Sequence, residues 1–146
     1  MWNDLGEYIA NHCDYKNKDN IDGFNNKSNV YNAPCKVVEI AIGKFFSVAD
    51  YLTNNPLVED FSATDINPND SNILFDDITN PNMDIYECAN IIYSIRPPQE
   101  LQPYIANIAN KTGATLIIKP FFNEDLNANI KMKLVNYKKA TFYQSI

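Results

Sequence analysis

The stretch KVVEIAIG, residues 36–43, decides the fold class of this chain. Its first seven residues are mostly apolar and β-branched, which is typical of a strand buried on both faces. After Gly43 the apolar side chains recur at helical intervals, at Phe45, Phe46, Val48, Ala49 and Leu52. A strand, a glycine turn and a helix in this order predict the first unit of an α/β domain.

Short apolar runs and polar turns continue along the rest of the chain. Further strands are predicted over residues 58–64, 72–75, 90–95 and 114–118, with a final β segment within residues 131–145. Pro98 favours the first turn of another helix, and Gly113 is placed to end it. We therefore expect a Rossmann-like fold, in which a mostly parallel, twisted sheet carries helices on both faces.

The segment before the first strand predicts a helix followed by a loop. The apolar residues Trp2, Leu5, Ile9 and Cys13 recur at spacings of three and four, which predicts an amphipathic helix. Residues 14–34 are dense in Asn, Lys and Asp and lack an apolar period, so we expect a polar, flexible loop there. All of residues 1–146 are interpreted as one domain.

Composition and charge exclude several classes of function. With 45% hydrophobic residues the chain is typical of globular proteins, and no apolar run approaches the roughly 18 residues that a membrane span needs. The N-terminus lacks the pattern of a signal peptide, so we expect a cytoplasmic protein without a membrane partner. The formal net charge of −6 disfavours autonomous nucleic-acid binding. A local patch of lysines near the C-terminus could still bind nucleic acid, although a solvated face is the simpler interpretation. These lysines are Lys131, Lys133, Lys138 and Lys139.

The cysteines and the single histidine offer no metal or nucleophile motif. Cys13, Cys35 and Cys88 are odd in number and widely spaced, which fits neither a disulfide framework nor a paired metal site. We expect them to be reduced and structural. His12 lies in the first predicted helix without a nearby partner, so we predict no zinc site and no catalytic triad.

Acidic side chains lie within the first predicted strand and at the ends of the second and third. Ligands of open parallel sheets bind beyond the carboxyl ends of the strands, where the connecting loops diverge. Glu39 lies within the first strand and Gly43 ends it, while Asp65 follows about 20 residues later, where an acid can bind ribose hydroxyls. Asp76 and Asp77 end the third strand. Together these residues predict a nucleotide-type ligand site, although each acid alone would also suit a turn or a solvated loop. A magnesium site on the aspartates is a weaker alternative.

This order of motifs resembles that of S-adenosylmethionine-dependent methyltransferases over residues 36–120. More specifically, VEIAIGKFFSVADYL, ATDINP, LFDDIT and YSIRPPQELQPYI resemble a small archaeal family, uncharacterised protein family 0146, whose members have that fold. The resemblance implies a truncated methyltransferase-like domain with S-adenosylmethionine as a cofactor. By position it implies Glu39 near the methionyl amino group, Gly43 allowing backbone approach, Asp65 on the ribose and Asp77 near the adenine amine.

The end of the fourth strand, Arg96-Pro97-Pro98, resembles in position the Asp/Asn-Pro-Pro-aromatic motif of amino-methyltransferases. A guanidinium cannot accept a hydrogen bond from a target amine, but it can hold a phosphate or carboxylate. We therefore predict a substrate or anion site at Arg96, Pro97 and Pro98. The alternative is that Arg96 forms only a surface salt bridge with Glu100.

Two functions remain open, because the chain has only a short polar loop after Lys119 where a methyltransferase adds a substrate cover. We favour a module that binds a nucleotide-type ligand, S-adenosylmethionine or a similar molecule, without catalysis. The alternative is an active methyltransferase that acts on a large substrate or uses a partner chain. A protein partner or a homo-oligomer is compatible with both functions.

Overall fold

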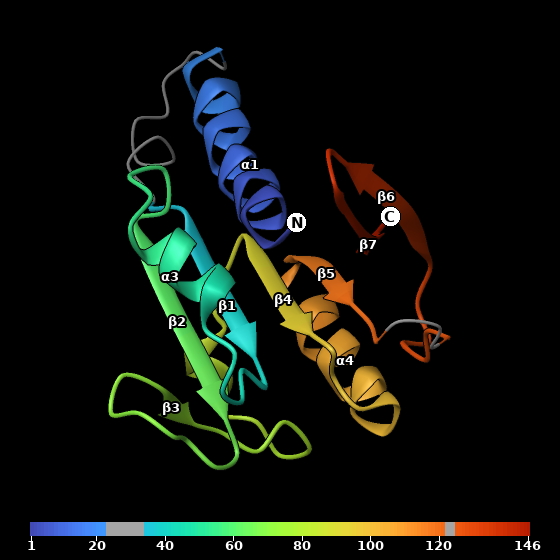
Figure 1. Cartoon of the computed structure of the whole chain (residues 1–146). Helices are drawn as coiled ribbons and strands as arrows, with labels where there is room; N and C mark the ends of the chain where they lie inside the picture. The colour runs from blue at the N-terminus through green and yellow to red at the C-terminus, as the bar shows by residue number, and fades with distance from the viewer. Residues whose placement is uncertain (23–33, 122–124) are drawn as a thin grey trace.

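A computed structural model of the chain describes residues 1–22, 34–121 and 125–146, with the backbone alone for residues 14–22 (Figure 1). These residues form an α/β fold around one seven-stranded sheet. The strands of the sheet are β1 Lys36–Ile40, β2 Asp60–Asp65, β3 Leu74–Phe75, β4 Ile91–Ile95, β5 Thr115–Lys119, β6 Met132–Tyr137 and β7 Ala140–Ser145.

The sheet is mixed but mostly parallel. Its strand order is β3-β2-β1-β4-β5-β7-β6, and the first five strands pair in parallel. Strand β7 is antiparallel to both β5 and β6. The prediction of a mostly parallel sheet is therefore confirmed, and the single predicted C-terminal β segment is a hairpin. Its turn contains Lys138 at a φ of 54°, without the Asn or Gly that usually indicates such a turn in a sequence.

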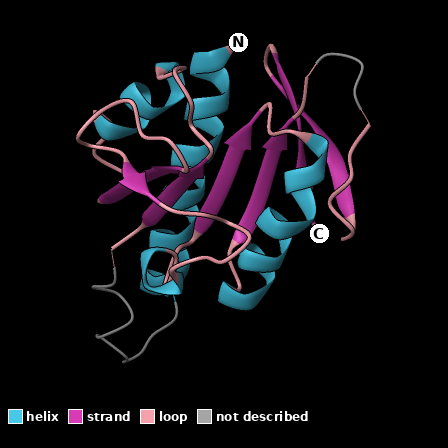
Figure 2. Ribbon diagram, turned by 90° about the horizontal axis from the view of Figure 1, so that it is seen from below, coloured by secondary structure: helices cyan, strands magenta, loops and turns pink. Residues whose placement is uncertain are grey.

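Helices cover both faces of the sheet, as expected from the sequence (Figure 2). On one face α1 (Trp2–Asp22) and α3 (Ser47–Thr53) pack against side chains such as Val37 and Tyr93. On the other face α4 (Gln102–Thr112), preceded by the short 3₁₀ helices η1 (Met83–Ile85) and η2 (Gln99–Leu101), packs against Val38 and Ile92. The alternation of Val37 and Val38 between the two faces follows from the two-residue period of a strand. Among the described residues, no helix is long and apolar enough to cross a membrane.

Helix α1 is longer than the apolar period predicts. The predicted loop start at residue 14 is wrong, because α1 continues to Asp22. An apolar period reports which residues pack on a core, whereas a helical backbone can continue wherever Pro and Gly are absent, and residues 14–22 contain neither. The remainder of the predicted loop, residues 23–33, lies outside the described residues.

A disulfide joins α1 to the start of β1, which corrects the expectation of reduced thiols. Cys13 and Cys35 are both buried, are bonded to each other, and have Cα atoms 5.6 Å apart. Disulfide formation depends on this proximity in space, which the sequence spacing does not report. Cys88 is a free and exposed thiol.

Candidate functional site

A cavity of about 530 Å³ lies at the carboxyl ends of β1, β2 and β3. Its volume is within the range of small-molecule sites, roughly 300–1,000 Å³. It adjoins the place where the strand order reverses, because β1 pairs with β2 on one side and with β4 on the other. The cavity is lined by Ile40, Ala41, Thr64, Asp65, Ile66, Asp76, Asp77, Ile78, Thr79, Pro98 and Leu101.

Asp65, the last residue of β2, connects this cavity to the turn after β1. Its Oδ2 accepts a hydrogen bond from the Gly43 N–H at 2.7 Å, and its Oδ1 accepts one from the Asn67 N–H at 2.9 Å. Gly43 has a φ of 61°, a conformation that favours glycine. A carboxylate has about four acceptor sites, so Asp65 can hold this turn and still accept hydrogen bonds from a ligand.

The two acids after β3 have different surroundings. Asp76 is buried and accepts hydrogen bonds from the Asn82 N–H at 2.9 Å and the Tyr86 hydroxyl at 2.5 Å. Burial and the bond to Asp76 raise the pKa of Tyr86. Asp77 accepts both of its side-chain hydrogen bonds on Oδ1, from the N–H and the hydroxyl of Thr79. The Oδ2 atom of Asp77 therefore has no hydrogen bond from a described residue, and Asp77 is the better candidate to contact a ligand.

Apolar side chains form the remaining wall of the cavity. Ile40 and Ile78 are buried, whereas Ile66 is 62% exposed beside the cavity. Leu101 and Pro98 reach the same space from the segment after β4. An exposed, large apolar side chain next to two carboxylates suits a ligand that combines a flat apolar group with hydroxyl or amine donors.

Glu39 is separate from this cavity. Its carboxyl group is buried in the sheet and accepts a hydrogen bond from the Tyr93 hydroxyl at 2.6 Å. Burial raises the pKa of Glu39 to about 8, against the smaller lowering effect of the Tyr93 hydrogen bond. The two residues face each other across the β1–β4 ladder, so the structure does not bring Glu39 together with Asp65 and Asp77. The sequence does not predict the pairing of Tyr93 with Glu39, because this pairing depends on the register of β1 against β4.

Of the three residues Arg96, Pro97 and Pro98, only Pro98 lines the cavity, and Pro97 is buried. The Arg96 guanidinium lies near three aromatic rings, with its Cζ 5.0 Å from the Phe45 centroid, 5.4 Å from that of Trp2 and 5.9 Å from that of Phe121. Among the described residues Arg96 forms no ion pair, so the alternative salt bridge with Glu100 is absent.

The aromatic cluster around Arg96 was not predicted from the sequence. Trp2 comes from α1, whereas Phe45 and Phe121 follow β1 and β5, and these three residues are far apart along the chain. Arg96 itself has a φ of 53°, a conformation that costs energy for a residue with a side chain. Burial and the nearby charge of Arg96 lower the pKa of Lys119 at the end of β5. Cation–π contacts are therefore a structural role for Arg96 that sequence reasoning missed.

The remaining predicted features lie away from the cavity. Lys138 of the C-terminal lysine group forms an ion pair with Glu7 of α1 at 2.6 Å, and the Lys139 N–H donates to Asp4. Lys138 and Lys139 thus contact helix α1 of the same chain. Among the residues that the structure describes, no three His, Cys, Asp or Glu side chains gather as a possible metal-binding set.

Comparison with known proteins identifies the family to which this chain belongs. The sequence profile of an uncharacterised protein family, UPF0146, matches residues 21–146. The chain belongs to this family. A UPF0146 protein of Methanothermobacter thermautotrophicus is 41% identical over 146 residues, which cover 100% of this chain and 96% of the relative. A second UPF0146 protein, from Archaeoglobus fulgidus, is 42% identical over 112 residues, covering 74% of this chain and 82% of that protein.

A third UPF0146 protein, from Methanocaldococcus jannaschii, is 41% identical over 116 residues, which cover 74% of this chain and 81% of that relative. The expected relationship to archaeal proteins of this family is therefore confirmed. All strands of the sheet and the residues that line the cavity fall within the match to the family profile. Most of α1, including Cys13, precedes that match.

Proposed function

We propose that this chain binds a nucleotide-type ligand, with an adenosine group in the cavity at the carboxyl ends of β1, β2 and β3. S-adenosylmethionine is the first candidate because of the resemblance of the sequence motifs. The observation that carries the proposal is the meeting of Asp65, Asp77 and several apolar side chains around a single cavity of about 530 Å³.

Each part of an adenosine group has a matching partner in this cavity. The Asp65 carboxylate supplies acceptors for ribose hydroxyls, in addition to its bonds with Gly43 and Asn67. The Oδ2 atom of Asp77 is an acceptor for the adenine amine. Ile66 and Ile78 offer apolar contact to the flat base.

The strand order supports the Rossmann-like and methyltransferase-like part of the proposal. The order β3-β2-β1-β4-β5 is that of doubly wound sheets, in which ligands bind outside the carboxyl ends of the strands next to the reversal point. Here the β6–β7 hairpin extends the sheet beyond β5. The cavity lies on the β1 side of the reversal, at the place where such folds bind the nucleoside.

Binding without catalysis fits the site better than methyl transfer does. Glu39, which the resemblance assigns to the methionyl amino group, is buried against Tyr93. Arg96, at the position of the target-binding residue, lies near Phe45 and Trp2 instead of the cavity. Both groups that would act on the reactive end of the cofactor are thus held by contacts within the chain.

Titration calorimetry tests the proposal with adenosine, S-adenosylmethionine, S-adenosylhomocysteine, NAD and ATP. An adenosine-containing ligand should bind, and Asp65→Ala should weaken it by about 1.5–3 kcal/mol, the value of hydrogen bonds to a charged group. Asp60→Ala is the matched control, because Asp60 is exposed at the opposite end of the same strand. Equal affinities of the Asp65 variant and the unchanged protein would overturn the ribose role, provided that both remain folded by circular dichroism.

The same titrations separate binding from methyl transfer. If the cavity holds only the adenosine group, adenosine and S-adenosylhomocysteine should bind with similar affinity. S-adenosylhomocysteine affinity more than about tenfold higher would mean that the homocysteine group makes contacts of its own, about 1.4 kcal/mol or more, and would favour the methyltransferase alternative.

A further inference from the structure

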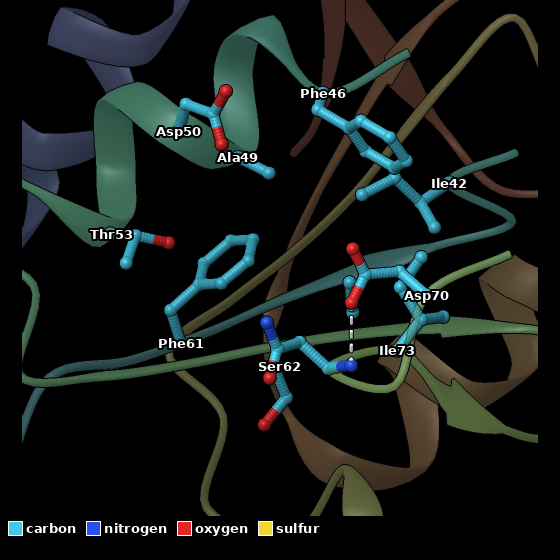
Figure 3. Close-up of a pocket in the computed structure, with 11 residues that line it drawn as sticks. Ile42, Phe46, Ala49, Asp50, Thr53, Phe61, Ser62, Asp70 and Ile73 are labelled. Carbon is cyan, nitrogen blue, oxygen red and sulfur yellow. Dashed lines mark hydrogen bonds between the residues drawn. The ribbon is translucent and has the colours of Figure 1, made fainter. Parts of the chain in front are cut away.

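A second cavity, of about 510 Å³, lies between α3 and β2 and has no part in the proposed nucleotide site (Figure 3). It is bordered by α3, by β2 and by the connection between β2 and β3. None of its lining residues also lines the cavity at the strand ends. The two cavities are therefore distinct candidate sites.

The second cavity is open because the connection from β2 to β3 contains no helix. Residues 66–73 contain no helix and no strand, so in the part of the chain that the structure describes no further element covers this part of β2 beside α3. Phe61 on β2 and Phe46 before α3 remain half-buried as a result. The fold thus leaves two aromatic rings accessible from one concave space.

Apolar side chains form one part of the lining of this cavity. Four buried aliphatic side chains form a small cluster of their own, and the rings of Phe46 and Phe61 pack against it; the four are Ile42, Ala49, Ala63 and Ile73. All six of these residues line the cavity. Such a surface favours the apolar body of a small molecule.

The charged side chains at the edge of this cavity are all acidic. Among the described residues that line the cavity, Asp50 on α3 and Asp70 on the β2–β3 connection are the two charged ones, and none is Lys, Arg or His. Neither carboxylate forms an ion pair with a described residue, and Asp70 accepts one backbone hydrogen bond, from the Asn72 N–H at 2.8 Å. Figure 3 shows both carboxyl groups turned into the space bordered by the two phenyl rings.

We propose that this cavity binds a small organic cation, in which an apolar body carries an amidinium, guanidinium or ammonium group. The aliphatic floor would hold the body, and the two carboxylates would accept hydrogen bonds from the cationic group. The ring faces of Phe46 and Phe61 add attraction for a positive charge. A ligand of negative charge, such as a phosphate, would be repelled by both carboxylates.

Benzamidine and benzamide are matched probes for this site, because they have the same shape and differ in charge. In titrations of the full chain, benzamidine should bind at least about tenfold more tightly than neutral benzamide, a difference of about 1.4 kcal/mol. Amide NMR spectra should show the shifted signals at Ala49, Ala63 and Asn72. Equal affinity for the two probes, or shifts that map elsewhere, would overturn the proposal.

Substitutions of the carboxylates complete the test. Asp50→Asn and Asp70→Asn keep the side-chain shape and remove the charge, so each should weaken benzamidine binding about tenfold. Asp60→Asn removes a charge from the outer end of β2, and Asp77→Asn removes one from the proposed nucleotide site; both should leave benzamidine affinity unchanged. A loss of the same size in all four variants would mean attraction to net charge alone and would overturn the specific site. Phe61→Leu provides a further variant that keeps the apolar surface and should lose the cation–π part of the affinity.

Discussion

Replacing Glu39 by Gln should make the stability of this protein less dependent on pH. The Glu39 carboxyl group is buried and bonded to the Tyr93 hydroxyl, and burial raises its pKa from 4.5 to about 8. Below about pH 4.5 the carboxyl group is protonated in both the folded and the unfolded state. Between that pH and about pH 8 it ionises in the unfolded chain alone. Ionisation therefore stabilises the unfolded state, and the free energy of unfolding falls as the pH rises.

The size of this effect follows from the pKa shift. At about 1.4 kcal/mol for each pKa unit, the shift from 4.5 to about 8 corresponds to a loss of about 5 kcal/mol once the pH exceeds the folded-state value. Between pH 5 and pH 7 the loss is about 2 to 3 kcal/mol. Gln has no titrating group, so the free energy of unfolding of Glu39→Gln should rise by this amount relative to the unchanged protein over the same pH interval.

Urea unfolding at several pH values measures this difference. Glu87→Gln, at an exposed position, is the matched control and should change stability by less than about 0.5 kcal/mol at every pH. If the difference between the Glu39 variant and the unchanged protein stayed constant from pH 5 to pH 8, Glu39 would be ionising in the folded state as it does in the unfolded one. The assignment of a neutral, buried carboxyl group would then be refuted.

Further variants test three other contacts. Cys13→Ser should lower the free energy of unfolding by about 3 kcal/mol under oxidising conditions, because the bond to Cys35 closes a long loop, and thiol reduction should remove the difference. Tyr86→Phe should cost about 1.5–3 kcal/mol in urea unfolding, because the buried carboxyl group of Asp76 loses the hydrogen bond donated by the Tyr86 hydroxyl; an unchanged midpoint would contradict this bond. Arg96→Ala should cost about 1 kcal/mol through its lost aromatic contacts, measured by the same method, while Arg96→Lys should retain part of that stability.

The elements whose signal lies within a few residues could be predicted from the sequence. The strand at residues 36–42 corresponds to β1, and the apolar period after Gly43 corresponds to α3. The sequence predicts that a helix ends at Gly113, and in the structure Gly113 caps α4 with a φ of 77°. These predictions depend on local periodicity and on backbone conformations that glycine adopts easily, so they need no knowledge of the tertiary fold.

Contacts between distant segments could not be predicted in the same way. The Glu39–Tyr93 bond requires the register of β1 against β4, and the Cys13–Cys35 bond requires the position of α1 across the sheet. The proximity of Asp65 and Asp77 at one cavity was expected, because the carboxyl ends of neighbouring parallel strands share an edge. The sequence did not indicate that Glu39 would face another part of the interior.

The position of Glu39 bears directly on what the cavity can do. In a strand, alternate side chains point to opposite faces, and Glu39 points to the α1 and α3 face, where Tyr93 and the residues of that core lie. The cavity instead receives Ile40 and Ala41, the next two residues along the chain. A carboxyl group that stays neutral up to about pH 8 and faces a packed core offers little attraction to a ligand's ammonium group. For the proposed nucleotide-type ligand, the described residues therefore offer contacts to the nucleoside part, whereas Glu39 offers none to a reactive end. This difference is the physical reason for proposing binding without catalysis.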